Sequence, residues 1–349
     1  MASTLQAISD RQGHPDQVVV AGEVLDLRID NAALSLRAAK LLHLLVRAAG
    51  AEACETMRHA VPVADLNEAF HLSTADFIDT ARELARTAVE LRYTNEHGRK
   101  VVKIGPMLAD IERDLDEYGE DDPAIVAWEF SPVMRVLLST SSHWAALSRR
   151  AILAFEGRYS LRLYELVSLR GGLQFKRWEK FELDDLRRRL GVEPGKLKEF
   201  SNFKLRALDP AVAEVNQLSG LEVTYEAVKT GRKVTHITLK WRERDTEGRA
   251  AVSRELETAR VGRRARREGT VEHVAPTEPA IGVSFPRFGS IRGTAFEHVA
   301  RAALPSPMPD LDQVAKEFIA WADRSGKPLK GEHVTEMWAG FCRSQHPAR

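Results

Sequence analysis

Cationic and amide side chains concentrate in two short stretches of the sequence, "KLKEFSNFKLR" (196–206) and "KTGRK" (229–233). Arginine can donate two hydrogen bonds to O6 and N7 of a guanine, and asparagine can pair in the same way with adenine. Lysine and arginine also bind backbone phosphates. These residue types are therefore suited to reading duplex DNA. The side chains concerned are Lys196, Lys198, Asn202, Lys204, Arg206, Lys229, Arg232 and Lys233.

The segments around these residues predict a helix followed by a hairpin. In 202–219 an apolar stripe runs from Phe203 to Leu218, and Asn202, Lys204 and Arg206 lie off it in the first turns. A recognition helix contacts bases with residues near its N-terminus, where N–H groups also favour phosphate. The runs "LEVTYEAV" and "KVTHITLKW" alternate as hairpin strands do, with a turn in "KTGR". Such a wing can bring its tip to a phosphate or to the minor groove.

Pro210 falls inside this predicted helix and leaves two alternatives open. A proline within a helix removes one backbone hydrogen bond and kinks the helix. Alternatively, Asp209 caps a new helix with Pro210 at its first position, so that two helices follow one another.

The preceding part of the chain predicts the same order of elements. Helical periodicity marks residues 36–50, 62–70 and 73–92, with Ser73 as an N-cap. A hairpin follows at 91–105, with its turn at 95–98. "AWEFSPVMRVLLS" is consistent with one more strand, and the acidic run "DIERDLDEYGEDD" is expected to be an exposed helix or loop. Three helices and a hairpin are the elements of a winged helix-turn-helix domain.

The second half repeats this order. "HWAALSRRAILAF", "YSLRLYELVSL" and "FELDDLRRRLGV" predict helices, the last of them closed by Gly191. The fold class is therefore α+β, with tandem winged helix-turn-helix domains and a small C-terminal helical appendage. The predicted division is a disordered tail (1–17), an N-terminal winged-helix domain (18–140), a C-terminal winged-helix domain (141–244), a charged linker (245–284) and a region of three short helices (285–349). The charged segment is expected to begin as a possible continuation helix before it becomes a linker.

The distribution of charge suggests the kind of partner, and the cysteines and hydropathy suggest the compartment. Residues 31–140 hold 12 Lys and Arg against 18 Asp and Glu, whereas residues 141–244 hold 21 against 13. A basic segment suits a polyanionic partner, although a solvated basic face gives the same count. Two distant cysteines, Cys54 and Cys342, fit a reducing compartment and hence a cytoplasmic protein. No apolar run approaches the roughly 18 residues that span a membrane, so no membrane partner is expected.

Enzymatic chemistry finds little support in the sequence. Neither a phosphate-binding loop nor a dinucleotide fingerprint is present, and the histidines lack metal-ligand spacing. We therefore expect no catalytic residue, no metal and no cofactor. Tyr159 and Tyr164 are the residues that a DNA-nicking enzyme could use as nucleophiles, but no metal site accompanies them.

Four strings give the sequence a family resemblance. They are "GRYSLRLYELVSLR" (157–170), "FELDDLRRRLGV", "FKLRALDPAVAEVNQLSGLEVTYE" and "GRKVTHITLKW". Together they resemble the plasmid replication initiators that bind iterons, the short repeats of plasmid origins. The resemblance is good over 149–241 and weaker over 35–140, and it does not cover the Arg-rich segment or the last helices.

This resemblance implies a function and partners. It implies two winged-helix domains, of which the C-terminal one reads the major groove and the N-terminal one serves dimerisation and secondary DNA contacts. It places Asn202, Lys204 and Arg206 on the recognition helix, and Arg158 or Arg162 near the DNA backbone. It also implies a homodimeric state and contact with the host initiator and helicase.

The expected function is a sequence-specific initiator of plasmid replication that is not an enzyme. The alternatives are a winged-helix transcriptional regulator, a nicking replication enzyme that uses Tyr159 or Tyr164, and an interaction scaffold whose basic face is incidental.

Overall fold

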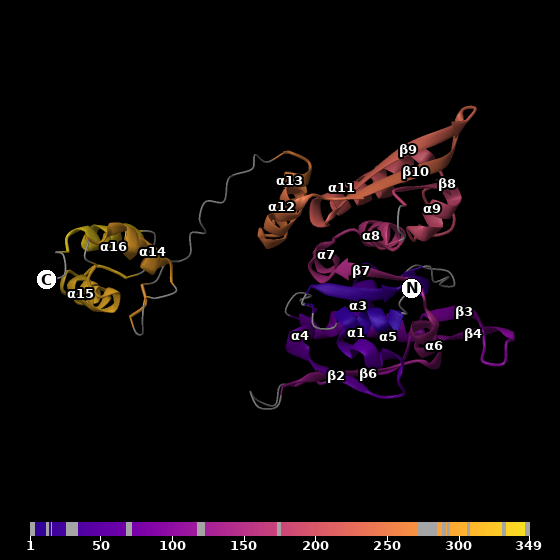
Figure 1. Cartoon of the computed structure of the whole chain (residues 1–349), viewed down its shortest axis with the longest axis horizontal. Coiled ribbons are helices and arrows are strands. Elements are labelled where there is room, and N and C mark those ends of the chain that lie inside the picture. Colours follow the sequence, from indigo (N-terminus) through magenta and orange to yellow (C-terminus); the bar gives the residue numbers. More distant parts are fainter. Residues whose placement is uncertain are drawn as a thin grey trace. The chain divides into compact units, whose positions relative to one another are not determined.

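The chain forms two compact units, Met1–Thr270 and Val271–Arg349, each with its own hydrophobic core (Figure 1). The computed structural model describes residues 4–11, 14, 16–25, 34–67, 72–116, 123–172, 176–270, 285–287, 291, 294–305, 308–329 and 333–345. Among the helices described, none has both the length and the apolar character that crossing a membrane requires.

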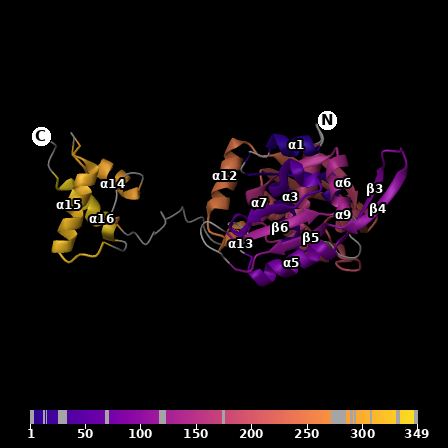
Figure 2. The same ribbon diagram turned by 90° about the horizontal axis from the view of Figure 1, so that it is seen from below.

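The N-terminal winged helix contains the three predicted helices and the predicted hairpin. The prediction of a helix over 73–92 is wrong at its end, because the helix stops at Arg86 and residues 88–92 belong to the first hairpin strand. The helices are α3 (Leu36–Ala49), α4 (Val63–Asn67) and α5 (Thr74–Arg86), and the hairpin is formed by β3 (Ala88–Thr94) and β4 (Lys100–Pro106). The hydroxyl of Ser73 accepts from the N–H of Asp76, so the predicted N-cap is confirmed. Figures 1 and 2 both show the β3–β4 hairpin extending away from the body of this unit.

A three-stranded antiparallel sheet of order β2-β6-β5 accompanies these helices. Its strands are β2 (His59–Pro62), β5 (Leu108–Arg113) and β6 (Ile125–Phe130), and α6 (Pro132–Thr140) follows β6. The prediction of a helix or loop for the acidic run is therefore wrong at β5. Leu108 is buried and Ile111 packs against the core, while Asp110 and Glu112 face solvent and pair with Arg58. The run's residues 117–122 lie outside the described part.

A strand near the N-terminus pairs with the strand that follows α6. β1 (Gln17–Ala21) pairs antiparallel with β7 (Trp144–Ser148), and the short helices α2 (Gly22–Leu25) and α7 (Arg149–Ala154) follow these strands. The sequence predicts helix from residue 143, but Ala145 and Leu147 point inward with a period of two, and Ser148 caps the helix that begins at Arg149. A boundary after Thr140 would therefore separate β7 from its partner strand.

The prediction of a disordered tail is wrong for α1 (Thr4–Arg11). Ala7 and Ile8 are buried against Val19, and the Thr4 hydroxyl donates to Ser141 Oγ at 2.8 Å. The apolar positions of this short helix are too few to show a period in the sequence. Residues 1–3, 12, 13 and 15 of the predicted tail lie outside the description.

The C-terminal winged helix follows the long helix α8 (Arg158–Gly171). Its elements are β8 (Trp178–Glu182), α9 (Leu183–Arg189), α10 (Phe200–Phe203), a π-helical turn (Lys204–Leu208), α11 (Asp209–Leu218), β9 (Leu221–Thr230) and β10 (Lys233–Glu243). The sheet has the order β8-β10-β9. Gly191 has a φ of 74° and ends the α9 region, as predicted. β8 was not predicted, because its five residues directly precede a helix.

Two helices continue the first unit beyond the sheet. They are α12 (Thr246–Glu257) and α13 (Arg263–Arg267). The possible continuation helix is confirmed at α12, whereas the prediction of a linker is wrong at α13. Their Arg- and Glu-rich composition hides the packing of Val252 and Arg263, which are both buried. Residues 271–284 lie outside the described part. The second unit contains α14 (Ala295–Ala303), α15 (Leu311–Arg324) and α16 (His333–Arg343), the three helices predicted there.

Candidate nucleic-acid interface

The predicted recognition helix is one continuous helical run from Phe200 to Leu218. Its apolar stripe is confirmed, since each of its core side chains is fully buried: Phe203, Ala207, Leu208, Ala211, Val215 and Leu218. Asn202, Lys204 and Arg206 are exposed on the other side of the first turns. The structure thus presents the predicted base-reading residues to solvent.

Pro210 is accommodated by the π-helical turn that precedes it. The N–H of Asp209 donates to the carbonyl of Lys204, five residues earlier, and Asp209 keeps helical angles of φ −60° and ψ −48°. In a regular helix the proline ring would collide with the carbonyl of the residue four positions earlier, Arg206. We infer that the wider turn relieves this contact. The proline therefore neither starts a separately capped helix nor breaks the run.

Asp209 connects the recognition helix to the wing. Its carboxylate accepts a hydrogen bond from the Tyr225 hydroxyl on β9 and lies 3.6 Å from the Nζ of Lys204. Burial, together with the Asp209 carboxylate, raises the pKa of Tyr225 above its usual value, which extends to higher pH the range in which the phenol donates this hydrogen bond. The sequence analysis missed this link, because no local pattern shows that an aspartate before a proline faces a strand tyrosine.

The loop before the helix is fixed by a cation that the sequence analysis also missed. Arg187 donates to the carbonyl of Lys198 at 2.6 Å, and its guanidinium lies 5.3 Å from the centroid of the Phe203 ring. Only 12% of its side chain is exposed. Lys196 and Lys198 themselves are exposed. Arg187 therefore holds the loop that carries these two lysines beside the recognition helix.

The wing is the β9–β10 hairpin, and its turn consists of Gly231 and Arg232. Gly231 has a φ of 61°, which a residue with a side chain rarely adopts, so glycine suits this position. Lys229, Arg232 and Lys233 are all exposed around this tip. The predicted hairpin and turn are confirmed.

Six cations of this surface make no ion pair with any residue in the described part of the chain. They are Lys196, Lys198, Arg206, Lys229, Arg232 and Lys233. Lys204 differs, because Asp209 neutralises it. Unneutralised cations at both the helix start and the wing tip give this face the charge that a polyanion requires.

Arg162 does not belong to this surface. Its guanidinium lies 3.1 Å from Glu165 Oε2, and Glu165 Oε1 lies 2.6 Å from His43 Nε2. Burial raises the pKa of Glu165, but Arg162 and His43 outweigh that effect, so the pKa falls below its usual value. Arg162 therefore neutralises a buried carboxylate, and a contact with the DNA backbone would compete with that ion pair.

Arg158 also has partners within the protein. It donates to the Tyr159 hydroxyl at 2.9 Å and lies 3.3 Å from Glu193. Its side chain is 38% exposed. A phosphate contact by Arg158 would therefore require the loss of its bond to Glu193.

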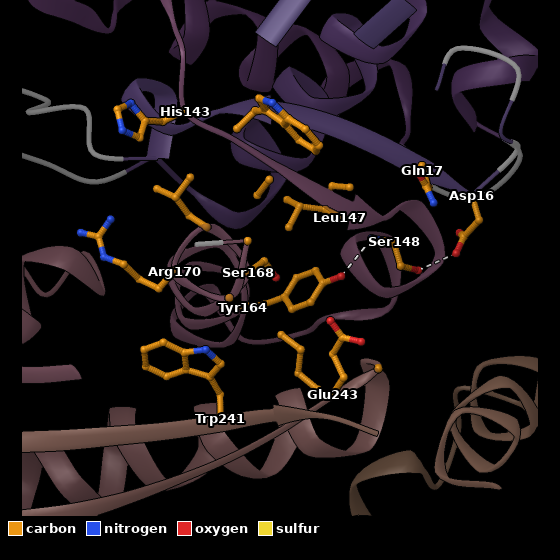
Figure 3. Close-up of a pocket in the computed structure, with 18 of the residues that line it drawn as sticks. Asp16, Gln17, His143, Leu147, Ser148, Tyr164, Ser168, Arg170, Trp241 and Glu243 are labelled. Carbon is orange, nitrogen blue, oxygen red and sulfur yellow. Dashed lines mark hydrogen bonds between the residues drawn. The ribbon is translucent and has the colours of Figure 1, made fainter. Parts of the chain in front are cut away.

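Tyr164 lies at a cavity of about 1030 Å³ between β7, α8 and the end of β10 (Figure 3). Its hydroxyl accepts from the N–H of Ser148 at 2.9 Å, and Ser148 in turn donates to Asp16. Burial raises the pKa of Tyr164 to about 12. Only 5% of the residue is exposed. No group of three metal-ligating side chains occurs among the described residues. The burial of the Tyr164 hydroxyl and its raised pKa do not suit a nicking nucleophile.

The chain contains two winged helices in tandem, and the second has an exposed cationic helix start and wing. These features define a DNA-binding protein. Comparison with known families then gives the identity. Residues 20–168 match the family described as "Initiator Replication protein, WH1", and residues 182–241 match "Initiator Rep protein, WH2". The two matches cover more than half of the chain. The chain belongs to the initiator Rep protein family and contains both winged-helix domains.

Solved structures similar to this chain include one described as "Crystal structure of Pi initiator protein in complex with iteron DNA". The sequences are 18% identical, the match covers 66% of this chain and 98% of that chain, and the TM-score is 0.49. No curated protein matches the sequence.

Proposed function

We propose that this initiator binds the direct repeats of a plasmid origin as double-stranded DNA, without catalysis and without a cofactor. The C-terminal winged helix, from β8 to β10, makes the main DNA contact, and the N-terminal winged helix serves dimerisation and secondary contacts. A cytoplasmic location, and contact with the host initiator and helicase, belong to the same proposal. The observation that carries it is the set of exposed, unpaired cations around Arg206 and the wing tip.

The side chains divide into two roles. Asn202 and Arg206 read base edges. Lys204 can also contact a base once its ion pair with Asp209 breaks, because such a surface pair contributes no more than about 1 kcal/mol. Phosphate contacts position the protein and carry no sequence information directly. They come from the loop and the wing tip: Lys196, Lys198, Lys229, Arg232 and Lys233.

Equilibrium binding tests this division. The DNA is a duplex carrying direct repeats from beside the gene, and a shuffled duplex serves as the reference. Arg206→Ala should lower the preference for the repeats by about 5- to 150-fold, since a base-reading arginine is worth roughly 1–3 kcal/mol. Lys233→Ala should weaken both duplexes alike and reduce the salt slope by about one.

Arg242→Ala is the matched control. Arg242 is an exposed arginine of the same hairpin, but it lies at the end away from the turn and pairs with Glu222. The Arg242→Ala substitution should leave the affinity for both duplexes and the salt slope unchanged. The role of Arg206 fails if Arg206→Ala keeps the full preference for the repeats. Nicked circles from supercoiled origin DNA with magnesium would contradict the non-enzymatic proposal.

A further inference from the structure

Leu205 is an apolar residue at the centre of a polar surface. It is 69% exposed and stands between Lys204 and Arg206 on the recognition helix. Within residues 182–241, all of which the structure describes, it is the one large hydrophobic side chain that is exposed. Isolated surface leucines are common, so exposure alone does not indicate a contact. The position of Leu205 between two cations of the recognition helix does suggest one.

The helix holds Leu205 level with the base-reading residues. It follows Asn202 by three positions, a spacing that places two side chains on neighbouring parts of a helix surface. Leu205 lies in the π-helical turn Lys204–Leu208. The last two residues of this turn, Ala207 and Leu208, are fully buried. The backbone beneath Leu205 is therefore anchored to the core.

The surroundings of Leu205 do not suit a protein partner. Its exposed neighbours Ser201, Asn202, Lys204 and Arg206 are polar or charged, so no contiguous apolar patch forms around it. In the major groove, by contrast, the apolar group that a side chain meets is the C5-methyl of thymine.

We propose that Leu205 is a specificity residue that packs on the C5-methyl group of a thymine next to the base read by Asn202 or Arg206. This inference rests on the proposed function, because it requires the recognition helix to enter the major groove. A leucine makes no hydrogen bond, so it favours thymine only through this methyl group.

The experiment removes the methyl group without changing base pairing. The full chain first selects its preferred duplex from a random-sequence pool. Each thymine of the selected duplex is then replaced in turn by deoxyuridine, which lacks the C5-methyl. Replacement at one position should weaken binding about fourfold, the factor for roughly one buried methyl group. With Leu205→Ala the same replacement should change binding by less than about 1.5-fold, because the apolar partner of the methyl is gone.

Val261→Ala is the matched control. Val261 is 90% exposed and lies outside the recognition helix, so this variant should keep the fourfold effect of deoxyuridine. The inference is overturned if no thymine replacement weakens binding, if the selected duplex has no thymine, or if Leu205→Ala retains the effect. In those cases, selection of a preferred duplex would still support the proposed function. Failure to select any sequence would overturn both.

Discussion

Lys40 is a buried cation, 5% exposed, at the contact between α3 and the end of α7. Its Nζ donates to the carbonyls of Leu153 and Phe155 at 2.8 and 2.6 Å. These carbonyls belong to the end of a helix, where a cation is favourable. Burial, followed by the nearby Arg260, nevertheless lowers the pKa of Lys40 from 10.5 to about 8. Desolvation, with Arg260, therefore outweighs the carboxylates of Glu214 and Glu156, which raise the pKa of Lys40.

The lowered pKa predicts how stability depends on pH. Below pH 8 the folded chain carries the full cost of a buried ammonium. Above it the folded state releases the proton while the unfolded state, with a pKa near 10.5, keeps it. From pH 7 to 9.5 the free energy of unfolding should therefore rise by about 2 kcal/mol relative to Lys40→Met, which has no proton to lose. Urea unfolding of both proteins at the two pH values measures this difference.

The exposed Lys229 supplies the control for this measurement. Lys229→Met should show no comparable change with pH relative to the unmodified protein. A Lys40→Met difference that stays constant between pH 7 and 9.5 would contradict the assignment.

At the scale of elements, α12 and α13 form a strap that joins the α7–α8 connection to the recognition helix. Arg260 pairs with Glu156 at 2.9 Å, and Arg267 lies 3.7 Å from Glu214 of α11. Glu214 itself accepts from the N–H groups of Glu156 and Gly157. The strap therefore supports the turn between α7 and α8 and the C-terminal half of α11 together.

Glu255 is the central carboxylate of this strap. It lies 3.5 Å from Arg263, which is buried, and 2.8 Å from Arg266. Glu255→Ala should lower the free energy of unfolding by about 3 kcal/mol, because it leaves the buried Arg263 and the half-buried Arg266 without their carboxylate. Glu268→Ala removes a carboxylate that pairs with the exposed Arg264 on the same strap, and should cost less than about 0.5 kcal/mol. Urea unfolding compares the two, and equal effects would contradict this role of Glu255.

The sequence predicts elements whose pattern is local and misses those whose partner is distant or whose alternation is hidden by charge. The recognition helix and the wing follow from the stripe at Phe203 and Leu218 and from the alternation around Gly231. β7 does not, because it is short and pairs with β1 near the N-terminus. β5 does not either, because it lies in an acidic run whose charges hide the alternation of Leu108 and Ile111, although its partner β6 is the next strand. The same limit applies to the site. Arg206 is exposed because it lies off the stripe, whereas Arg162 pairs with Glu165, a carboxylate whose burial beside His43 the sequence does not show.

At the scale of the whole molecule, the two units have separate hydrophobic cores. The second core is aromatic: Phe285, Phe318 and Trp338 are buried together, and the Trp338 indole donates to the carbonyl of Phe296 at 2.9 Å. Every residue proposed to contact DNA lies in the first unit. The helices of the second unit are therefore not needed for the proposed DNA contact.

This separation predicts the result of shortening the chain. A protein that ends at Thr270 keeps the first core and the strap, so its affinity for the repeats should stay within about twofold of the full chain and its salt slope should not change. A protein that ends at Arg244 loses the strap as well and should melt several degrees lower, as expected when about 2–3 kcal/mol is removed from a domain of this size. Thermal melts and binding isotherms of the three proteins measure both effects. Loss of the preference for the repeats on ending at Thr270 would show that the second unit takes part in DNA recognition.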